Sequence, residues 1–220
     1  MNIFDIIGPI MIGPSSSHTA GAVRIGRVAR KILGEEPATA KIELHGSFAM
    51  TYKGHGTDKA LIAGILGMKP DDERIIHSIA LAREKNLHFT FHQIKLPEAH
   101  PNTAVLTLTG INGATCVVEG ASIGGGNIQI TKLNGMAAAF SGGKDTLIVA
   151  HHDRPGVIAA VTDKLAQLDI NIGSFKLSRP KKSQLAIMTI ELDSEVESLV
   201  ITELKNLANI VSVTYMHPAS

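Results

Sequence analysis

The stretch TLIVAHHDRPGVIAAVTDKL, residues 146–165, predicts a strand that turns directly into a helix. Its opening run is apolar, as in a buried strand, and the DRPG tetrapeptide that follows is typical of a turn. After the turn, Val157, Val161 and Leu165 recur at the spacing of one helical face. Asp153 is the expected helix cap, and the proline two residues later suits the first turn. A strand–helix pair of this kind is the first half of a small mixed module.

The rest of the C-terminal third completes this module. An alternating strand, with Gly173 as a candidate bulge, is followed across a short turn by a second strand. A helix with Ser194 as its cap and an acidic first turn comes next, and an apolar strand comes last. The order β-α-β-β-α-β predicts a ferredoxin-like fold for residues 146–220. The four later elements are expected at residues 170–178, 185–192, 194–207 and 210–216.

The N-terminal part, residues 1–143, is expected to be a separate α+β domain. A helix over residues 17–33 ends at Gly34, and a second helix has Thr57 as its expected cap. Strands with alternating or apolar patterns separate and follow the helices. The glycine-containing stretch at residues 141–145 is the predicted boundary. The remaining expected elements are helices at residues 57–67 and 70–85 and strands at residues 39–46, 87–96, 104–110, 114–122 and 126–135.

Composition excludes several function classes. The chain has 220 residues, of which 44% are hydrophobic and 19% charged, and its net charge is +1. The basic residues are scattered, which argues against a nucleic-acid surface, and no apolar run is long enough to span a bilayer. The N-terminal segment lacks the basic start of a secretory signal, so a cytoplasmic protein is expected. Cys116, the single cysteine, is expected to be a buried core residue rather than a nucleophile or ligand.

The segment GPSSSHTAG, residues 13–21, carries more hydroxyl groups than a helix cap needs. One serine, Ser16 or Ser17, suffices for the cap. Additional hydroxyls at a helix start make a site for a carboxylate or phosphate. The helix dipole is expected to lower the pKa of His18, which keeps the imidazole neutral and able to accept a proton. The pattern alone leaves open a plain cap and a functional site.

HGSFAMTYKGHGTD, residues 45–58, is a second helix start with a histidine. Gly54 and Gly56 flank His55 and leave its imidazole accessible to a ligand. The alternative is a glycine-rich loop whose only role is to lead into the helix that Thr57 caps. If the two helix starts point the same way, their histidines form one polar pocket with two proton carriers.

Three further stretches have weaker patterns. HPNT, residues 100–103, is typical of a turn into a strand. SIGGGN, residues 122–127, is either a glycine-rich anion cradle or a bulged hairpin, and the hairpin is the simpler interpretation. HHDRPG, residues 151–156, ends at a helix start, where a small amino acid could bind.

GPSSSHTAG, HGSFAMTYKGHGTD, HPNT and SIGGGN stand in the order and spacing of a known family. The chain resembles the β subunit of bacterial iron–sulfur-dependent L-serine dehydratases over nearly its whole length. Its first part is similar to the allosteric substrate-binding domain, which has a counterpart in some phosphoglycerate dehydrogenases. Residues 146–220 resemble an ACT domain, a module that often binds amino acids.

This resemblance implies an ammonia-lyase that converts L-serine to pyruvate and ammonia. A cysteine-rich α subunit is implied to hold a [4Fe–4S] cluster whose open iron acts as a Lewis acid on the serine hydroxyl. This chain, with one cysteine, is expected to hold no metal itself. His18 and His55 are the implied catalytic residues, one as the base and the other as a positioning or acid group. The implied substrate-binding residues are Ser15, Ser16, Ser17, Thr19, Gly54, Thr57 and Asn102.

The ACT resemblance implies either a regulatory site or a contact between copies of the chain. A module of this size buries little core alone, so homo-association through the ACT domain is expected. A small amino acid such as L-serine would bind at the shared edge, and a dimerisation module without a ligand is the alternative. The implied effector-binding residues are His152, Asp153, Arg154, Gly156 and Asn171.

Two rival functions remain at this level. The chain could be a non-catalytic regulatory subunit that senses serine or another amino acid. It could also serve a pyridoxal-phosphate dehydratase, because SIGGGN resembles a phosphate cradle. That chemistry needs a Schiff-base lysine in a larger fold, and no lysine here has such a context, so this rival ranks far below the first.

Overall fold

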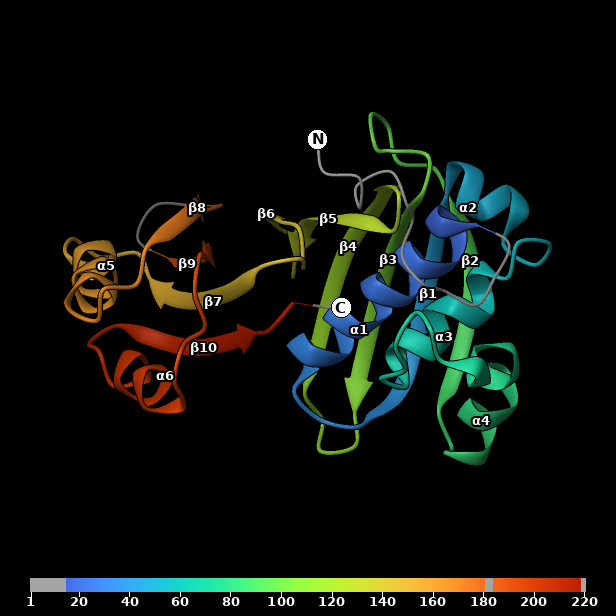
Figure 1. Ribbon diagram of the computed structural model, residues 1–220, viewed down its shortest axis with the longest axis horizontal. Helices are drawn as coiled ribbons and strands as arrows, with labels where there is room; N and C mark the ends of the chain where they lie inside the picture. The colour runs from blue at the N-terminus through green and yellow to red at the C-terminus, as the bar shows by residue number, and fades with distance from the viewer. Residues whose placement is uncertain (1–14, 181–183, 219–220) are drawn as a thin grey trace. The chain divides into compact units, whose positions relative to one another are not determined.

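The computed structural model describes residues 15–180 and 184–218 and divides into two compact units (Figure 1). The first unit reaches Asn134, and the second spans residues 135–218. The strand β6, Met136–Phe140, falls in the second unit, ahead of the boundary expected at residues 141–145. The domain limits 1–143 and 146–220 stay predictions. Within the described ranges, no helix is both long and apolar enough to cross a membrane.

A mixed sheet forms the centre of unit 1. β1 and β2 are parallel, whereas β3, β4 and β5 continue the sheet with antiparallel pairing. Side chains alternate between two faces, and in β3 the face with Ala104, Leu106 and Leu108 is fully buried. Up to β5 the strand order is β2-β1-β3-β4-β5, with β1 Pro37–His45, β2 His88–Ile94, β3 Thr103–Gly110, β4 Thr115–Gly124 and β5 Asn127–Leu133.

Helices cover one face of this sheet (Figure 1). α1 packs so closely on β4 that a Cβ on Gly120 would come within 3.3 Å of the Ile25 side chain. The expected helix over residues 17–33 is confirmed, although it begins at Ser16 and its first turns, Ser16–Gly21, form a π-helix, η2. The helical segments are η2 Ser16–Gly21, α1 Ala22–Leu33, α2 Gly46–Thr51, α3 Thr57–Ile65, the 3-10 helix η3 Glu73–His77 and α4 Ser78–Glu84.

α1 and α3 lie side by side and touch through glycine. A Cβ on Gly64 would lie 2.1 Å from the Val23 carbonyl oxygen, and a Cβ on Gly26 would lie 2.5 Å from the backbone of α3. Further along, Arg30 Nη1 donates to the Ile65 carbonyl oxygen at 3.0 Å. Because η2, which leads into α1, also contacts α3, and Arg30 near the end of α1 reaches the end of α3, the two helices run in the same direction and their starts lie together.

From β7 onward, unit 2 has the predicted β-α-β-β-α-β order, which confirms the ferredoxin-like fold. Its core joins strands and helices through buried side chains that include Leu147, Val161, Met188 and Leu204. The bulge expected at Gly173 is confirmed, because the register between β8 and β9 shifts there. The antiparallel strand order is β10-β7-β9-β8, with β7 Asp145–His152, α5 Val157–Gln167, β8 Ile172–Ser178, β9 Leu185–Leu192, α6 Ser198–Lys205 and β10 Ile210–Met216.

Three of the predicted helix caps are wrong, namely those at Thr57, Asp153 and Ser194. At the first two helices a glycine with φ of +73° or +86° turns the chain directly into the helix, so no capping side chain is used. Asp153 instead pairs with Arg179, with Oδ2 and Nη1 3.3 Å apart. The third helix begins four residues later than expected. The N-cap residues observed are Gly56, Gly156 and Glu197.

We expect Gly64→Ala to destabilise unit 1, although alanine has the higher helix propensity. The added methyl group meets the backbone of α1, and separating the helices costs about 1–3 kcal/mol, against a propensity gain of about 1 kcal/mol. Urea unfolding followed by circular dichroism measures the free energy of unfolding. Gly54→Ala is the control, because a Cβ there makes one ordinary contact, 3.7 Å from the Thr51 carbonyl oxygen. A Gly64→Ala chain as stable as the wild type contradicts the close helix contact.

Candidate active site

The parallel run of α1 and α3 brings two histidines together ahead of these helices. The ring centroids of His18 and His55 lie 4.8 Å apart, with the ring planes at 87°. His18 belongs to η2, which leads into α1, and His55 lies in the turn before α3. The expected convergence of the two imidazoles is confirmed, while their catalytic roles stay predictions.

The serine run starts η2 one residue earlier than the sequence predicts. Ser15, rather than Ser16 or Ser17, is the cap: its Oγ accepts the His18 backbone N–H at 3.3 Å. Ser16 and Ser17 are half-buried. Thr19 is buried, and its Oγ1 has no hydrogen-bond partner among the described residues. A π-helix is rare and is found often at functional sites, so the local winding agrees with a site here.

The His18 ring is held on several sides. Ser15 Oγ lies 3.4 Å from Nδ1, and Ser47 Oγ in α2 lies 3.2 Å from Nε2. The ring also meets Phe48 edge-on, with centroids 5.3 Å apart. Phe48 is fully buried, so it is a fixed wall for the imidazole. The orientation of His18 is therefore set by packing and by two hydroxyl groups.

His18 is neutral in this environment. Burial, which penalises the imidazolium, lowers the pKa of His18, and the nearby His55 lowers it further. The expected direction is confirmed, but burial rather than the helix dipole is the main cause. Only 8% of the surface of His18 is exposed to solvent. A neutral imidazole leaves its neighbour free to take up a proton without a like charge beside it.

His55, in contrast, is exposed and open. Gly54 and Gly56 flank it, and Gly56 adopts φ of +73°. The His55 backbone N–H is bonded to the Thr51 carbonyl oxygen at 2.9 Å, which fixes the turn. Its ring nitrogens have no hydrogen-bond partner among the described residues. Thr57, which follows, is fully buried, and its Oγ1 lacks a partner within the described ranges.

The HPNT loop packs against α2, the helix that contacts the His18 ring. A Cβ on Gly46 would lie 2.6 Å from the Pro101 carbonyl oxygen, and the Phe48 N–H donates to that oxygen at 3.4 Å. Asn102 comes next, and its buried Oδ1 has no partner in the described part of the chain. The Asn102 carbonyl oxygen accepts the Ser122 N–H at 3.0 Å. This loop therefore connects α2, which carries Ser47, to the SIGGGN segment.

Two residues of this region, Ser47 and Ser122, were not predicted from the sequence. Ser47 lies inside the HGSFAMTYKGHGTD motif, but its hydroxyl shows its role only through a contact 29 residues away. Ser122 opens SIGGGN and packs on η2, where a Cβ on Gly21 would lie 2.1 Å from its Oγ. That Oγ is buried and unpaired among the described residues. Their place in quoted motifs is the one signal that the sequence offers for them.

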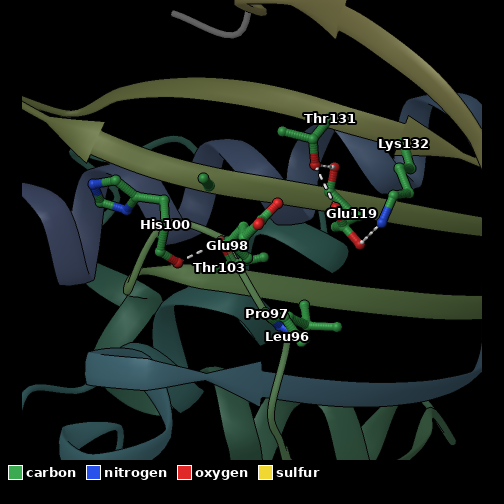
Figure 2. Close-up of a pocket in the computed structure, with 10 residues that line it drawn as sticks. Leu96, Pro97, Glu98, His100, Thr103, Glu119, Thr131 and Lys132 are labelled. Carbon is green, nitrogen blue, oxygen red and sulfur yellow. Dashed lines mark hydrogen bonds and ion pairs between the residues drawn. The ribbon is translucent and has the colours of Figure 1, made fainter.

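A separate cavity of about 360 Å³ is lined in part by His100 and Thr103 of the same loop (Figure 2). Residues 96–100 form one wall, and side chains of β3, β4 and β5 form the other. Glu119 accepts from Thr131 Oγ1 at 2.8 Å and pairs with Lys132 Nζ at 3.0 Å (Figure 2). Glu98 adopts φ of +63°, which is uncommon without glycine. Neither histidine of the pair lines this cavity.

Unit 2 separates the residues implied as an effector site. His152, Asp153, Arg154 and Gly156 lie together where β7 leads into α5. Asn171 lies at the opposite end of the sheet, since its neighbour Ile172 pairs with Leu192, which pairs with the first residue of β7. There Asn171 Nδ2 donates to Asp193 Oδ2 at 2.7 Å. The structure thus brings together four of the five residues.

The described residues do not bring together the donor atoms that a metal ion needs. Cys116 is the single cysteine, it is buried, and its Sγ faces the Ala29 carbonyl oxygen at 3.6 Å. Burial raises the pKa of its thiol to about 11, which disfavours the thiolate that a metal needs. The described residues contain no group of three or more His, Cys, Asp or Glu side chains that could hold a metal ion. A cluster with several thiolate ligands does not fit these residues.

Comparison with known proteins identifies the family. The chain is 47% identical over 213 residues to the probable L-serine dehydratase β chain of Bacillus subtilis, a match that covers 97% of this chain and 96% of that protein. The chain belongs to the serine dehydratase β-chain family. It is also 42% identical over 198 residues to the L-serine dehydratase β chain of Peptoniphilus asaccharolyticus, with 89% of each chain covered. The resemblance seen in the sequence is confirmed.

The modules of this family member match as well. The family model described as serine dehydratase beta chain matches residues 2–78, and the ACT domain model matches residues 146–209. Unit 2 therefore contains an ACT domain. A D-3-phosphoglycerate dehydrogenase of Bacillus subtilis is 27% identical over 195 residues, which are 87% of this chain and 36% of that protein. The counterpart expected in phosphoglycerate dehydrogenases is thus found.

We expect the pKa of His18 to lie below the ordinary histidine value of about 6.5. His55→Ala should raise the pKa of His18, but not as far as that ordinary value. Removing His55 removes the like-charge repulsion, but burial, the larger cause, remains. Nuclear magnetic resonance titration of the full chain measures both values. A His18 pKa at or above the ordinary value in the wild type contradicts the buried, neutral imidazole.

We also expect Cys116 to resist thiol reagents in the folded chain. With its pKa raised to about 11, only about one thiol in a thousand is ionised at pH 8. The side chain is also 2% exposed. A thiol-specific chromogenic reagent should react slowly with the native chain and promptly, with one equivalent, in denaturant. Prompt reaction of the native chain contradicts this placement of Cys116.

Proposed function

We propose that this chain is the β subunit of an L-serine dehydratase and acts with a separate α chain to convert L-serine into pyruvate and ammonia. The contact of the His18 and His55 rings at 4.8 Å carries the proposal, in a member of the serine dehydratase β-chain family. Elimination of water from serine needs a base for the Cα proton and a route for loss of the hydroxyl group. Two adjacent imidazoles suit that need.

His55 is the better candidate for the base. Its ring nitrogens have no partner among the described residues, and the side chain is exposed. A free lone pair on an accessible imidazole can take the Cα proton directly. The flanking glycines support this role, because they leave the approach to the ring open.

His18 is assigned to positioning or proton donation. Both of its ring nitrogens contact serine hydroxyls, so the one basic lone pair of the neutral ring is engaged and is not free for the Cα proton. Its lowered pKa keeps it neutral. When His55 takes up a proton, a neutral neighbour costs less than an imidazolium would.

Buried polar atoms without partners support a substrate site beside the pair. Thr19 Oγ1, Thr57 Oγ1 and Asn102 Oδ1 have no hydrogen-bond partner among the described residues. Each such group costs about 1–3 kcal/mol while it stays unpaired. The ammonium, carboxylate and hydroxyl groups of serine would supply the missing partners. Ser15, Ser16 and Ser17 are assigned to the carboxylate, and Gly54 to the open approach.

The [4Fe–4S] cluster that the family resemblance implies is assigned to the α chain. One buried thiol does not fit a cluster, and the described residues offer no other donor group for it. This chain's own part is to bind the substrate, orient it and move protons. The α chain is accordingly proposed to be rich in cysteine.

The ACT domain is proposed to join copies of the chain and to bind a small amino acid near the start of α5. His152, Asp153, Arg154 and Gly156 are the residues assigned to that ligand. Asn171 is left out, because it lies at the far end of the sheet and is paired with Asp193. Because the chain contains an ACT domain, the alternative function is that of a non-catalytic subunit that senses an amino acid.

Reconstitution tests the proposal. The chain is co-expressed anaerobically with a cysteine-rich α partner, and pyruvate release from L-serine is measured for each chain alone and for both together. We expect activity with both chains only. His55→Ala and His18→Ala should each lower kcat by about a hundredfold or more. His88→Ala, at an exposed position in β2, is the control and should retain wild-type activity.

Two outcomes would contradict the proposal. Full turnover in both histidine variants, with loss only of activation by serine, would make the chain a regulatory subunit. Pyruvate release by the α chain alone, at the rate of the pair, would have the same meaning. In either case the ring contact would have to be explained as structural.

A further inference from the structure

β2 is the outer strand of the unit 1 sheet, and its free edge is accessible. It pairs with β1 on one side, and no described backbone group bonds to its other side. Among the strands from β1 to β5, β2 is the one in which no residue is buried. A row of unpaired N–H and C=O groups on an accessible strand is a template for pairing with another chain.

β2 lacks the features by which proteins usually protect such an edge, which include lysine, proline and β-bulges. The strand is HFTFHQI, residues 88–94, and it contains neither proline nor any Lys, Arg, Asp or Glu. Its register with β1 advances without a shift along the whole strand, so no bulge twists the edge away. A straight, unprotected strand is suited to pairing, and we expect its edge to be covered by a partner strand.

Aromatic side chains gather at this edge. Phe91 stacks on Tyr52 with ring centroids 5.8 Å apart, and Phe89 meets Phe91 edge-on at 6.0 Å. The chain has only six Phe and two Tyr, yet three of these residues are here and each is half-buried. Phe48 and Phe140, in contrast, are fully buried. Partly exposed aromatic residues are typical of the contact surfaces between proteins.

The sequence of β2 fits a second copy of the same strand. Its first five residues, HFTFH, read the same in both directions about Thr90. In an antiparallel pair centred there, Thr90 lies opposite Thr90 of the copy, and His88 lies opposite the copy's His92. Phe89 lies opposite the copy's Phe91, and such cross-strand aromatic pairs stabilise a sheet. Because side chains alternate, both phenylalanines stay on one face of the sheet and the other three residues on the opposite face.

We propose that two copies of this chain pair antiparallel through β2, with the two-fold axis at Thr90. Such a contact is isologous, since each copy offers the same strand to the other. It adds an interface in unit 1 to the association assigned to the ACT domain, and it does not depend on the catalytic roles of His18 and His55. Backbone groups make the strand pairing, so His88→Ala, the control for catalysis, leaves it in place.

Thr90→Cys in the full chain tests the axis. The background is quiet, because the one natural cysteine, Cys116, is buried and its thiol pKa is raised to about 11. Opposite residues of an antiparallel pair have Cα atoms about 4.5–5.5 Å apart, within the reach of a disulfide. We expect mild oxidation to convert the variant into a covalent dimer on a non-reducing gel. Thr115→Cys, at an exposed position on the same sheet face but in β4, is the matched control and should cross-link much more slowly.

His88→Cys and His92→Cys test the register. Within either variant alone, the two thiols of a pair are four residues apart along the strands, about 13 Å, which is too far for a disulfide. When the two variants are co-expressed, each new thiol faces the other. We therefore expect cross-linking between the two variants and little within either one.

A charge at the axis gives a second readout with the same thiols. Thr90→Lys in both chains of the co-expressed pair places like charges opposite each other, which should slow cross-linking about two- to fivefold. Thr90→Lys in one chain with Thr90→Glu in the other should restore the rate. Urea unfolding of each variant shows whether its fold is retained.

Three results would overturn the pairing. Thr90→Cys could cross-link no faster than Thr115→Cys, or His88→Cys could cross-link as well alone as with His92→Cys. The Thr90→Cys thiol could also be protected from thiol reagents only when the α chain is co-expressed, which would assign the edge to that chain. Cross-linking reports the neighbour of each thiol, so association through the ACT domain does not by itself produce the expected results.

Discussion

The contact between α1 and α3 at Gly26 and Gly64 is the constraint on which the site depends. His18 precedes Gly26 by eight residues, and His55 precedes Gly64 by nine. At a helical rise of about 1.5 Å per residue, those separations correspond to about 12 and 14 Å. Two helices that run in the same direction and touch at this point therefore bring both rings to nearly the same level. A side chain at either glycine would push the backbones apart and displace the rings, even though neither glycine touches them.

The two histidines are chemically different because their surroundings differ. His18 is buried, with serine hydroxyls at both nitrogens, and its pKa is lowered first by burial and then by His55. His55 is exposed, in a glycine-flanked turn, with ring nitrogens that have no partner among the described residues. Pairs of titratable groups in unlike environments are how one site assigns unlike proton-transfer roles. The asymmetry here arises from helix packing and from one short loop, which are structural causes rather than properties of histidine.

The parts of this structure that local patterns determine could be predicted from sequence, and the parts that depend on distant contacts could not. Alternation and helical spacing are local, so the elements from β7 to β10 and their β-α-β-β-α-β order follow from them, whereas the short elements α2 and β6 were not predicted. The helix caps at Thr57 and Asp153 are wrong because a preceding glycine in the left-handed region makes the turn without a side chain. Ser47 was missed because its partner is 29 residues away. Asn171 was grouped with the DRPG loop by sequence motif, and strand direction places it at the opposite end of the sheet.

The proposed division of the enzyme between two chains has a physical basis in two features of this chain, its buried thiol and its exposed His55. Its one thiol is sealed in the core with a pKa raised to about 11, so it cannot supply a cluster. His55 is exposed, and an imidazole in water must shed its hydration before it can take a carbon-bound proton. Closing an active site removes that water and strengthens every electrostatic interaction inside it. A partner chain that covers His55 would therefore supply two things at once, the metal that the proposal assigns to it and the dry surroundings that the exposed base lacks.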